Sequence, residues 1–174
     1  PAVERARAAG IRLALCSGRP AFGITREFAE RMEPDGWHIF QNGASVVRFP
    51  DGRTHSVRLD PGQITTLIAR ARSTGRTLEL YSDLDYAVED DTESTRQHAE
   101  LLGVPFTPRP LEAFDQAIVR AQWMVSRALH EELLAESYPG IEMWPSTSPL
   151  MPDTLFVALL PTGVSKGTGV QALA

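Results

Sequence analysis

Cysteine and lysine are nearly absent from this sequence. Its 174 residues include one cysteine, Cys16, so no internal disulfide can form, and this usage favours a reducing, cytoplasmic setting. Of the 17 residues that are Lys or Arg, only Lys166 is a lysine. Because lysine supplies a compact ammonium on a flexible stem and arginine does not, Lys166 is a candidate functional residue. The alternative is a solvated surface charge in an arginine-rich composition.

Three further absences exclude whole classes of protein. No apolar run approaches the roughly 20 residues needed to span a bilayer, so we expect no membrane partner. The formal net charge of −5 argues against a nucleic-acid partner, which would need clustered positive charge. The four histidines show no spacing typical of metal ligands. The hydrophobic content of 43% and charged content of 22% are ordinary for a globular protein.

The first 59 residues show the pattern of an α/β core. An apolar run at residues 11–16 predicts a strand buried on both faces. It ends in Ser17-Gly18 just before a helix predicted over residues 21–32. A hydroxyl and free backbone N–H groups at such a junction can bind an anion, although Ser and Gly there also serve turn geometry alone. The other elements predicted here are a helix at 1–9, a strand at 38–41 and a hairpin of strands 45–49 and 54–59.

In residues 60–160 the order of predicted elements changes to paired strands interspersed with helices, which predicts an α+β domain with a sheet and helices. The predicted elements are a helix at 63–74, strands at 77–81 and 86–89, a helix at 93–102, an irregular segment at 104–114, a strand at 117–125, a helix at 127–137, and strands at 141–144 and 154–160. A joint at 161–163 then leads into a helix over 165–174. We therefore expect a discontinuous core of residues 1–59 and 161–174 with an inserted domain at 60–160.

Three short motifs stand in a characteristic order along the chain. They are Leu15-Cys16-Ser17-Gly18-Arg19-Pro20, then Gln41-Asn42-Gly43-Ala44, and after about 100 residues Gly163-Val164-Ser165-Lys166-Gly167. In this order and with this insertion, the chain resembles the haloacid dehalogenase (HAD) superfamily of phosphohydrolases, in its Cof-like branch. The resemblance implies an α/β fold with a Rossmann-like core and a large inserted α+β cap.

The resemblance also implies an activity and a site. It implies a Mg²⁺-dependent phosphatase that acts on a small phosphorylated metabolite, such as a sugar phosphate, through a phosphoaspartate intermediate. Ser17 and Lys166 would be catalytic, Ser17 by hydrogen-bonding the phosphoryl group and Lys166 by neutralising charge. Gly18, Arg19, Asn42 and Gly43 would bind substrate.

Two motifs of this family are missing from the sequence. The first, Asp-x-Asp-x-Thr, supplies the nucleophile, and a later acidic motif completes the Mg²⁺ site. An unpaired helix at the start and too few core strands lead us to expect the native protein to extend at both ends and to carry these motifs there. We expect no metal ligands in this chain, and we expect the chain by itself to be inactive.

Other interpretations of these residues stay open. A non-catalytic phosphate-binding or interaction module of the same fold is the alternative function. Asn42-Gly43 is also a strong hairpin signal without any ligand. We interpret Cys16 as a small buried hydrophobe. Asp83 and Asp85, with their acidic neighbours Glu89, Asp90, Asp91 and Glu93, are interpreted as a solvated acidic face. Trp123, Met143 and Trp144 are predicted to lie in the core of the inserted domain.

Overall fold

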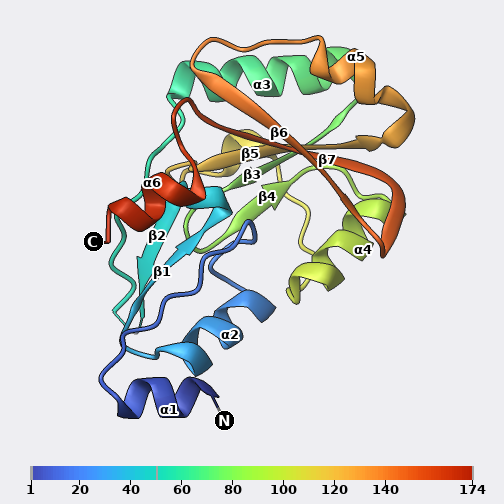
Figure 1. Cartoon of the computed structure of the whole chain (residues 1–174). Helices are drawn as coiled ribbons and strands as arrows, with labels where there is room; N and C mark the ends of the chain where they lie inside the picture. Colours follow the sequence, from blue (N-terminus) through green and yellow to red (C-terminus); the bar gives the residue numbers. More distant parts are fainter. Residues whose placement is uncertain (1, 50, 174) are drawn as a thin grey trace.

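The computed structural model describes residues 2–49 and 51–173, which form two adjoining groups of elements (Figure 1). The first group comprises α1 (Ala2–Ala8), α2 (Ile24–Met32), β1 (Trp37–Phe40), the short 3-10 helix η1 (Gln41–Gly43), β2 (Ser45–Arg48) and α6 (Lys166–Gln171). The second comprises α3 (Pro61–Thr74), β3 (Thr77–Tyr81), β4 (Tyr86–Val88), α4 (Glu93–Leu102), η2 (Leu111–Ala113), β5 (Arg120–Ser126), η3 (Arg127–Leu129), α5 (His130–Leu134), β6 (Ile141–Ser148) and β7 (Met151–Pro161).

The second group is built on an antiparallel sheet with the strand order β4-β3-β5-β7-β6. Figure 1 shows α3 and α5 on one side of this sheet and α4 on the other. Side chains alternate between the faces. On β5, Ala121, Trp123 and Val125 enter the core beneath α3 and α5. Gln122 and Met124, at the positions between them, point to the opposite face, which α4 covers only in part.

Helix α3 forms as predicted because its ends carry strong signals. Gln63 Oε1 accepts a hydrogen bond from the Asp60 backbone N–H at 2.9 Å, and Gly75 ends the helix in the left-handed conformation at φ 67°. Leu67, Ile68 and Ala71 are buried on its inner face. At 14 residues it is the longest helix described. None of the helices within residues 2–49 and 51–173 has the length and hydropathy that a membrane span requires.

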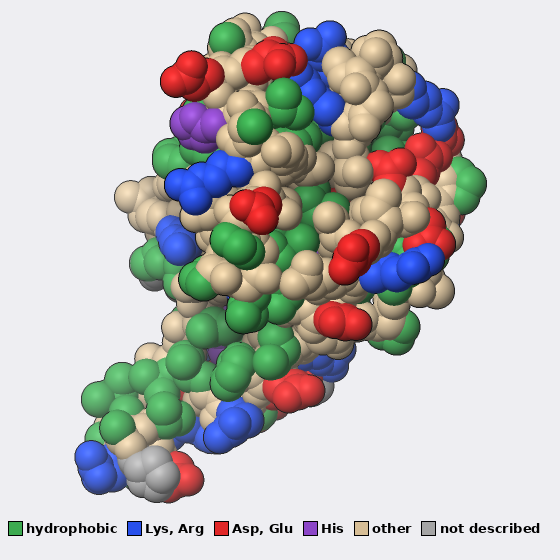
Figure 2. Space-filling view, turned by 90° about the vertical axis from the view of Figure 1, so that its right-hand side faces the viewer, with side chains coloured by type: hydrophobic (Ala, Val, Ile, Leu, Met, Phe, Trp, Pro, Cys, Tyr) green, Lys and Arg blue, Asp and Glu red, His purple; other side chains and the backbone are tan. Residues whose placement is uncertain are grey.

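The prediction of a buried strand at residues 11–16 is wrong. The segment is extended and follows β1 in parallel, with a hydrogen bond from Ile39 N to Leu15 O at 2.8 Å. Within the described residues β1 is its only strand neighbour, so its side chains are poorly covered: Ile11 is 55% exposed. Cys16 is exposed as well, which overturns its interpretation as a buried hydrophobe. Figure 2 shows hydrophobic side chains on the narrow lower part of the molecule, where α1 and α2 lie in Figure 1.

The hairpin forms one strand earlier than predicted. β1 pairs with β2 in an antiparallel register, from Trp37 opposite Arg48 to Phe40 opposite Ser45. The predicted return strand at 54–59 is not a regular strand. It follows β2 with hydrogen bonds from His55 N to Val46 O and from Val57 N to Ala44 O, both 2.9 Å. Pro50 of the predicted turn, and Pro1 and Ala174 of the predicted terminal helices, lie outside the described residues.

The last two strands are longer than predicted. The sequence pattern predicts strands at 141–144 and 154–160, the second one after Pro149 and Pro152. β6 nevertheless continues through Pro145, because β6 is an edge strand and a missing N–H on its outer side breaks no ladder hydrogen bond. The helix predicted at 127–137 is instead the short pair η3 and α5.

Candidate active site

Three segments far apart in the sequence meet at one end of the first group. The loop that follows the extended segment is bonded to the β1–β2 turn: Asn42 N donates to Ser17 O at 3.1 Å, and Gln41 N donates to Arg19 O at 3.0 Å. The N-terminus of α6 lies against the same turn. A Cβ atom added to Gly43 would be 2.0 Å from the carbonyl oxygen of Ser165, so only glycine permits this approach. These contacts bring Ser17, Asn42 and Lys166 together.

The turn that makes this junction has an unusual backbone. Gln41 and Asn42 have φ values of 51° and 56°, and they are the described non-glycine residues with positive φ. Buried Gln41 holds the conformation by donating from Nε2 to Ser82 O at 2.8 Å. Such conformations persist only where surrounding contacts support them, and they concentrate at functional sites. The Asn-Gly signal is therefore a hairpin turn and also part of the junction.

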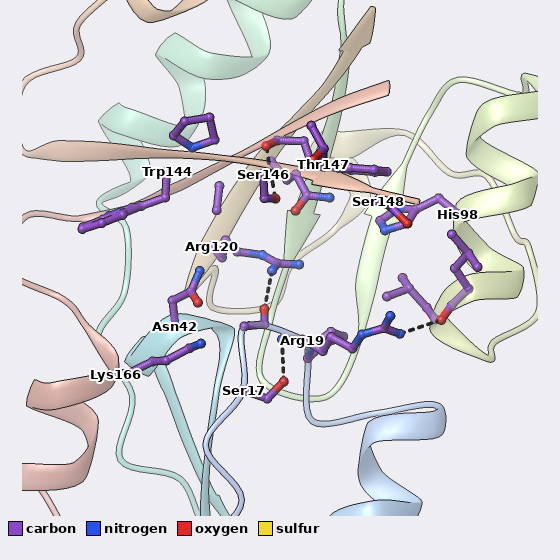
Figure 3. Close-up of a pocket in the computed structure, with 18 of the residues that line it drawn as sticks. Ser17, Arg19, Asn42, His98, Arg120, Trp144, Ser146, Thr147, Ser148 and Lys166 are labelled. Carbon is purple, nitrogen blue, oxygen red and sulfur yellow. Dashed lines mark hydrogen bonds between the residues drawn. The ribbon is translucent and has the colours of Figure 1, made fainter. Parts of the chain in front are cut away.

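A cavity of about 830 Å³ separates this junction from the open face of the five-stranded sheet (Figure 3). Its size falls within the range of ordinary small-molecule sites. Five of the predicted site residues line it: Ser17, Gly18, Arg19, Asn42 and Lys166. The sixth, Gly43, lies behind them against Ser165. All six predicted positions are thus brought to one place.

The sheet side of the cavity was missed by the sequence analysis. It is lined by side chains from α4 and from the outer positions of three strands, namely His98, Arg120, Gln122, Trp144, Ser146, Ser148, Phe156 and Ala158. Trp144 is 48% exposed, so its assignment to the core is wrong, whereas Trp123 is fully buried and Met143 packs against the core as predicted. One signal was available: Arg120 and Gln122 are polar positions alternating with apolar ones along a single strand.

Two arginines join the junction to the second group. Arg120 Nη1 donates to Gly18 O at 2.9 Å, and its guanidinium lies 3.9 Å from the centre of the Tyr81 ring. Arg19 Nη1 donates to Leu101 O at 3.0 Å. Within the described residues neither arginine forms a salt bridge, and Lys166 forms none either. Arg19, Arg120 and Lys166 place three positive charges around the cavity, which makes it suited to an anion.

The described residues do not fit a Mg²⁺ ion. Mg²⁺ prefers oxygen ligands and commonly uses carboxylates. Among the residues described, no Asp or Glu lines the cavity, and no group of three or more His, Cys, Asp or Glu side chains could hold a metal.

Asp83 and Asp85, whose Asp-x-Asp spacing matches the start of the missing first motif, have structural partners. Asp83 accepts hydrogen bonds from the hydroxyls of Ser45 and Ser56, and Asp85 pairs with Arg109 at 2.7 Å. The interpretation of these two residues as a solvated face is therefore wrong, because both are held by partners and only half-exposed. Their neighbours Asp90, Asp91 and Glu93 are exposed, as expected of a solvated face, whereas Glu89 is half-buried and pairs with Arg72 at 3.2 Å.

Beneath the cavity, a fully buried carboxylate holds two of the lining side chains. Glu79 Oε1 bonds His98 Nδ1 at 2.8 Å, and Glu79 Oε2 accepts from Gln122 Nε2 at 2.8 Å and from the Tyr81 hydroxyl at 2.7 Å. Burial alone would raise the pKa of the Glu79 carboxyl. The charge and hydrogen bond of His98, together with the Tyr81 hydroxyl, outweigh burial and hold that pKa below its ordinary value.

Fold and cavity together define an α/β protein with a cavity, lined by arginine and lysine side chains, between the junction of three segments and an antiparallel sheet. The sequence model of the haloacid dehalogenase-like hydrolase family matches residues 1–174. The chain therefore belongs to this family, and the resemblance stated from its motifs is confirmed.

Several solved structures share the fold, among them two HAD phosphatases. BT1666 from Bacteroides thetaiotaomicron, a HAD phosphatase, is 20% identical with a TM-score of 0.74, over 99% of this chain and 62% of its own. The HAD subclass IIB sugar phosphatase BT4131 is 20% identical with a TM-score of 0.75, over 99% of this chain and 65% of its own. TM0651 from Thermotoga maritima is 17% identical with a TM-score of 0.77, over 99% of this chain and 65% of its own. The chain thus spans less than two thirds of these relatives. No curated protein sequence matches it significantly.

Proposed function

We propose that this chain forms the phosphate-binding and substrate-selecting part of a phosphatase that acts on a small phosphorylated metabolite, such as a sugar phosphate. The observation that carries the proposal is the meeting of Ser17, Asn42 and Lys166 at one end of a single cavity. Membership of the HAD-like hydrolases supports a hydrolase, and the sugar phosphatase BT4131, which has the same fold, supports the substrate class.

The local geometry supports a distinct role for each group. Ser17 Oγ accepts a hydrogen bond from Arg19 N at 3.0 Å, so its own proton is free to be donated to a phosphoryl oxygen. Lys166, at the first turn of α6, brings a positive charge to the same end of the cavity and would neutralise phosphoryl charge. Asn42 and Arg19 would contact the substrate, together with the backbone N–H of Gly18. Gly43 would act by admitting α6 to the turn.

We further propose that residues 60–160 act as a cap on a core formed by residues 1–59 and 161–174. The five-stranded sheet turns its polar face toward Ser17 and Lys166, which supports this division. A cap in this position would exclude water from the cavity and select the substrate.

The described residues account for binding and charge neutralisation only. They present no carboxylate nucleophile and no Mg²⁺ ligands to the cavity. Mg²⁺ dependence and a phosphoaspartate intermediate are what family membership implies for the whole protein, and we propose them on that basis alone. The lack of a carboxylate among the described residues that line the cavity also favours the second candidate, a non-catalytic phosphate-binding module of this fold. Hydrolysis of sugar phosphates by the protein encoded by the entire gene separates the two.

Binding of inorganic phosphate to the purified chain tests the proposal directly. A two-dimensional ¹H–¹⁵N NMR titration should shift the amides of Ser17, Gly18 and Asn42. Lys166→Met should weaken binding by about tenfold, because a charged hydrogen bond is worth about 1.5 kcal/mol or more. Lys166→Arg should restore it only in part, because the wider guanidinium does not replace a compact ammonium.

The control is Arg127→Met, which removes an exposed cation outside the cavity. It should leave phosphate binding unchanged. The melting temperature should not move in either Lys166 variant, since Lys166 is exposed and forms no salt bridge to the described residues. Equal phosphate affinity in the wild type and Lys166→Met would show that Lys166 does not bind phosphate.

A further inference from the structure

His98 reaches the cavity in one fixed orientation. Its Nδ1 atom is bonded to Glu79, and its ring lies 4.8 Å from the Phe156 ring. The other ring nitrogen, Nε2, has no hydrogen bond to any described residue, and the ring lines the cavity. About 11% of the side chain stays accessible. One polar atom, Nε2, is therefore left for a ligand.

The hydrogen bonds to His98, Gln122 and Tyr81 use both carboxylate oxygens of Glu79. The side chain is also only about 1% exposed, so it cannot contact a ligand. Its partner Gln122 faces the cavity from the next strand, in register with Glu79. The buried carboxylate therefore acts only by fixing the positions of His98 and Gln122.

Burial of such a network opposes folding. Hydrogen bonds repay the desolvation of buried polar side chains only partly, and apolar groups of the same shape can give an equally or more stable protein. The opposite face of the sheet packs beneath α3 through a continuous hydrophobic cluster that includes Leu78, Trp123 and Val157. The Glu79 network lies on the other face, which borders the cavity, so His98 and Gln122 are within reach of a ligand.

The position of His98 relative to the phosphate-binding end follows from α4. The carbonyl oxygen of Leu101, near the end of α4, accepts from Arg19. His98 lies about one turn earlier, roughly 5 Å along the helix axis. Figure 3 shows His98 and Ser148 at the opposite end of the lining from Lys166 and Asn42. A phosphorylated compound bound at Ser17 and Lys166 would thus point its remaining atoms toward His98.

We propose that His98 is a specificity-determining residue whose Nε2 atom hydrogen-bonds a hydroxyl of the substrate's sugar or polyol part, at the end of the cavity away from the phosphate. The neighbouring Phe156 ring offers an apolar surface for the C–H face of a sugar, and Ser148 offers a hydroxyl. This inference rests on the proposed function, because it takes the phosphate to be bound at the Lys166 end.

The test compares three ligands on the whole 174-residue chain: inorganic phosphate, phenyl phosphate and glucose 6-phosphate. The wild type should bind glucose 6-phosphate more tightly than phenyl phosphate. His98→Asn keeps an amide N–H for Glu79 but has no counterpart of Nε2. It should lower the affinity for glucose 6-phosphate by about fivefold, as expected for one lost hydrogen bond of about 1 kcal/mol, and should leave the other two affinities unchanged. His130→Asn, an exposed histidine outside the cavity, is the matched control.

A purely structural role for His98 predicts another pattern. All three affinities would then change together with the melting temperature, and the preference for glucose 6-phosphate would persist, which overturns the proposal. Should His98→Asn fail to fold, the wild-type ring resonance of His98 decides: it should shift on adding glucose 6-phosphate and not on adding phenyl phosphate, and the reverse overturns the proposal. Failure of inorganic phosphate to bind in a Lys166-dependent way would instead overturn the proposed function, and this inference with it.

Discussion

Arg120 donates a hydrogen bond from Nη1 to the carbonyl oxygen of Gly18 at 2.9 Å, across 102 positions of the sequence. Its guanidinium carbon also lies 3.9 Å from the centre of the buried Tyr81 ring. The side chain is about 4% exposed, so both contacts are shielded from water. This contact links β5 to the loop that carries Ser17 and places the two sides of the cavity in a defined relation.

Arg120→Met should destabilise the protein by about 1–3 kcal/mol, because it removes a buried charged hydrogen bond and a cation–π contact. It should also weaken phosphate binding, since the Gly18 loop loses its contact with the sheet. Urea denaturation and phosphate titration measure the two effects. Arg127→Met is the control for loss of an arginine. A variant as stable as the wild type would show that the contact to Gly18 contributes nothing.

Gly43→Ala should be far more damaging than Gly52→Ala. Both glycines have positive φ, 102° and 66°, so both substitutions strain the backbone. A Cβ at Gly52 has nothing within 4 Å, whereas one at Gly43 would lie 2.0 Å from Ser165 O. We expect about 1 kcal/mol for Gly52→Ala and at least about 2 kcal/mol more for Gly43→Ala, with loss of phosphate binding. Similar unfolding free energies would contradict the close approach of α6.

Glu136 should make stability depend on acid pH. Hydrogen bonds from Arg70 first, then from Tyr138 and Arg76, lower its pKa to about 2 against the opposing effect of burial. A pKa below the unfolded value near 4.5 means that the carboxylate stabilises the fold above about pH 5, and that this stability is lost as the pH falls toward 2.

Glu136→Gln should therefore unfold about 1–2 kcal/mol more easily than the wild type at pH 7, a discounted value because Arg70 is 41% exposed. The difference should shrink steadily between pH 5 and pH 2. Glu131→Gln, at an exposed position in α5 a few residues before Glu136, should show no such trend. A pH-independent difference would place the effect of Glu136 in packing and not in charge.

The purified 174-residue chain should release no p-nitrophenol from p-nitrophenyl phosphate, with or without Mg²⁺. A hydroxyl and an ammonium cannot replace both a carboxylate nucleophile and a metal ion, and no carboxylate among the described residues lines the cavity. Mg²⁺-dependent release would contradict this expectation. Asp83→Asn and Asp85→Asn would then be tested first.

Most helices and strands of the second group could be predicted from the sequence, because the residues that begin and end them lie within short stretches of the chain. The boundaries of β3 and α4 are those predicted, since Gly75 and Gly103 end helices and a capping threonine, Thr92, begins α4. Residues 11–16 could not be predicted in the same way. Whether an apolar run becomes a buried strand depends on which strands lie beside it, and that information is not in the run itself.

The two sides of the cavity also differed in how well their residues could be predicted from the sequence. The motifs around Ser17, Asn42 and Lys166 are short runs of sequence, so each could be recognised without knowledge of the fold. His98 and Trp144 lie on different elements and gain their place only when α4 and β6 border the same face. Trp144 in particular looks like a core residue until the sheet order shows that it sits on an edge strand beside the cavity.

The alternation of side chains along the five-stranded sheet has an evolutionary consequence. Each strand carries two interleaved sets of residues, and only one of them packs beneath α3. Positions such as Trp144, Ser146 and Ser148 can therefore be replaced with little disturbance of the residues that hold the sheet together. A sheet of this kind can acquire a new ligand preference one substitution at a time while its stability is inherited almost intact.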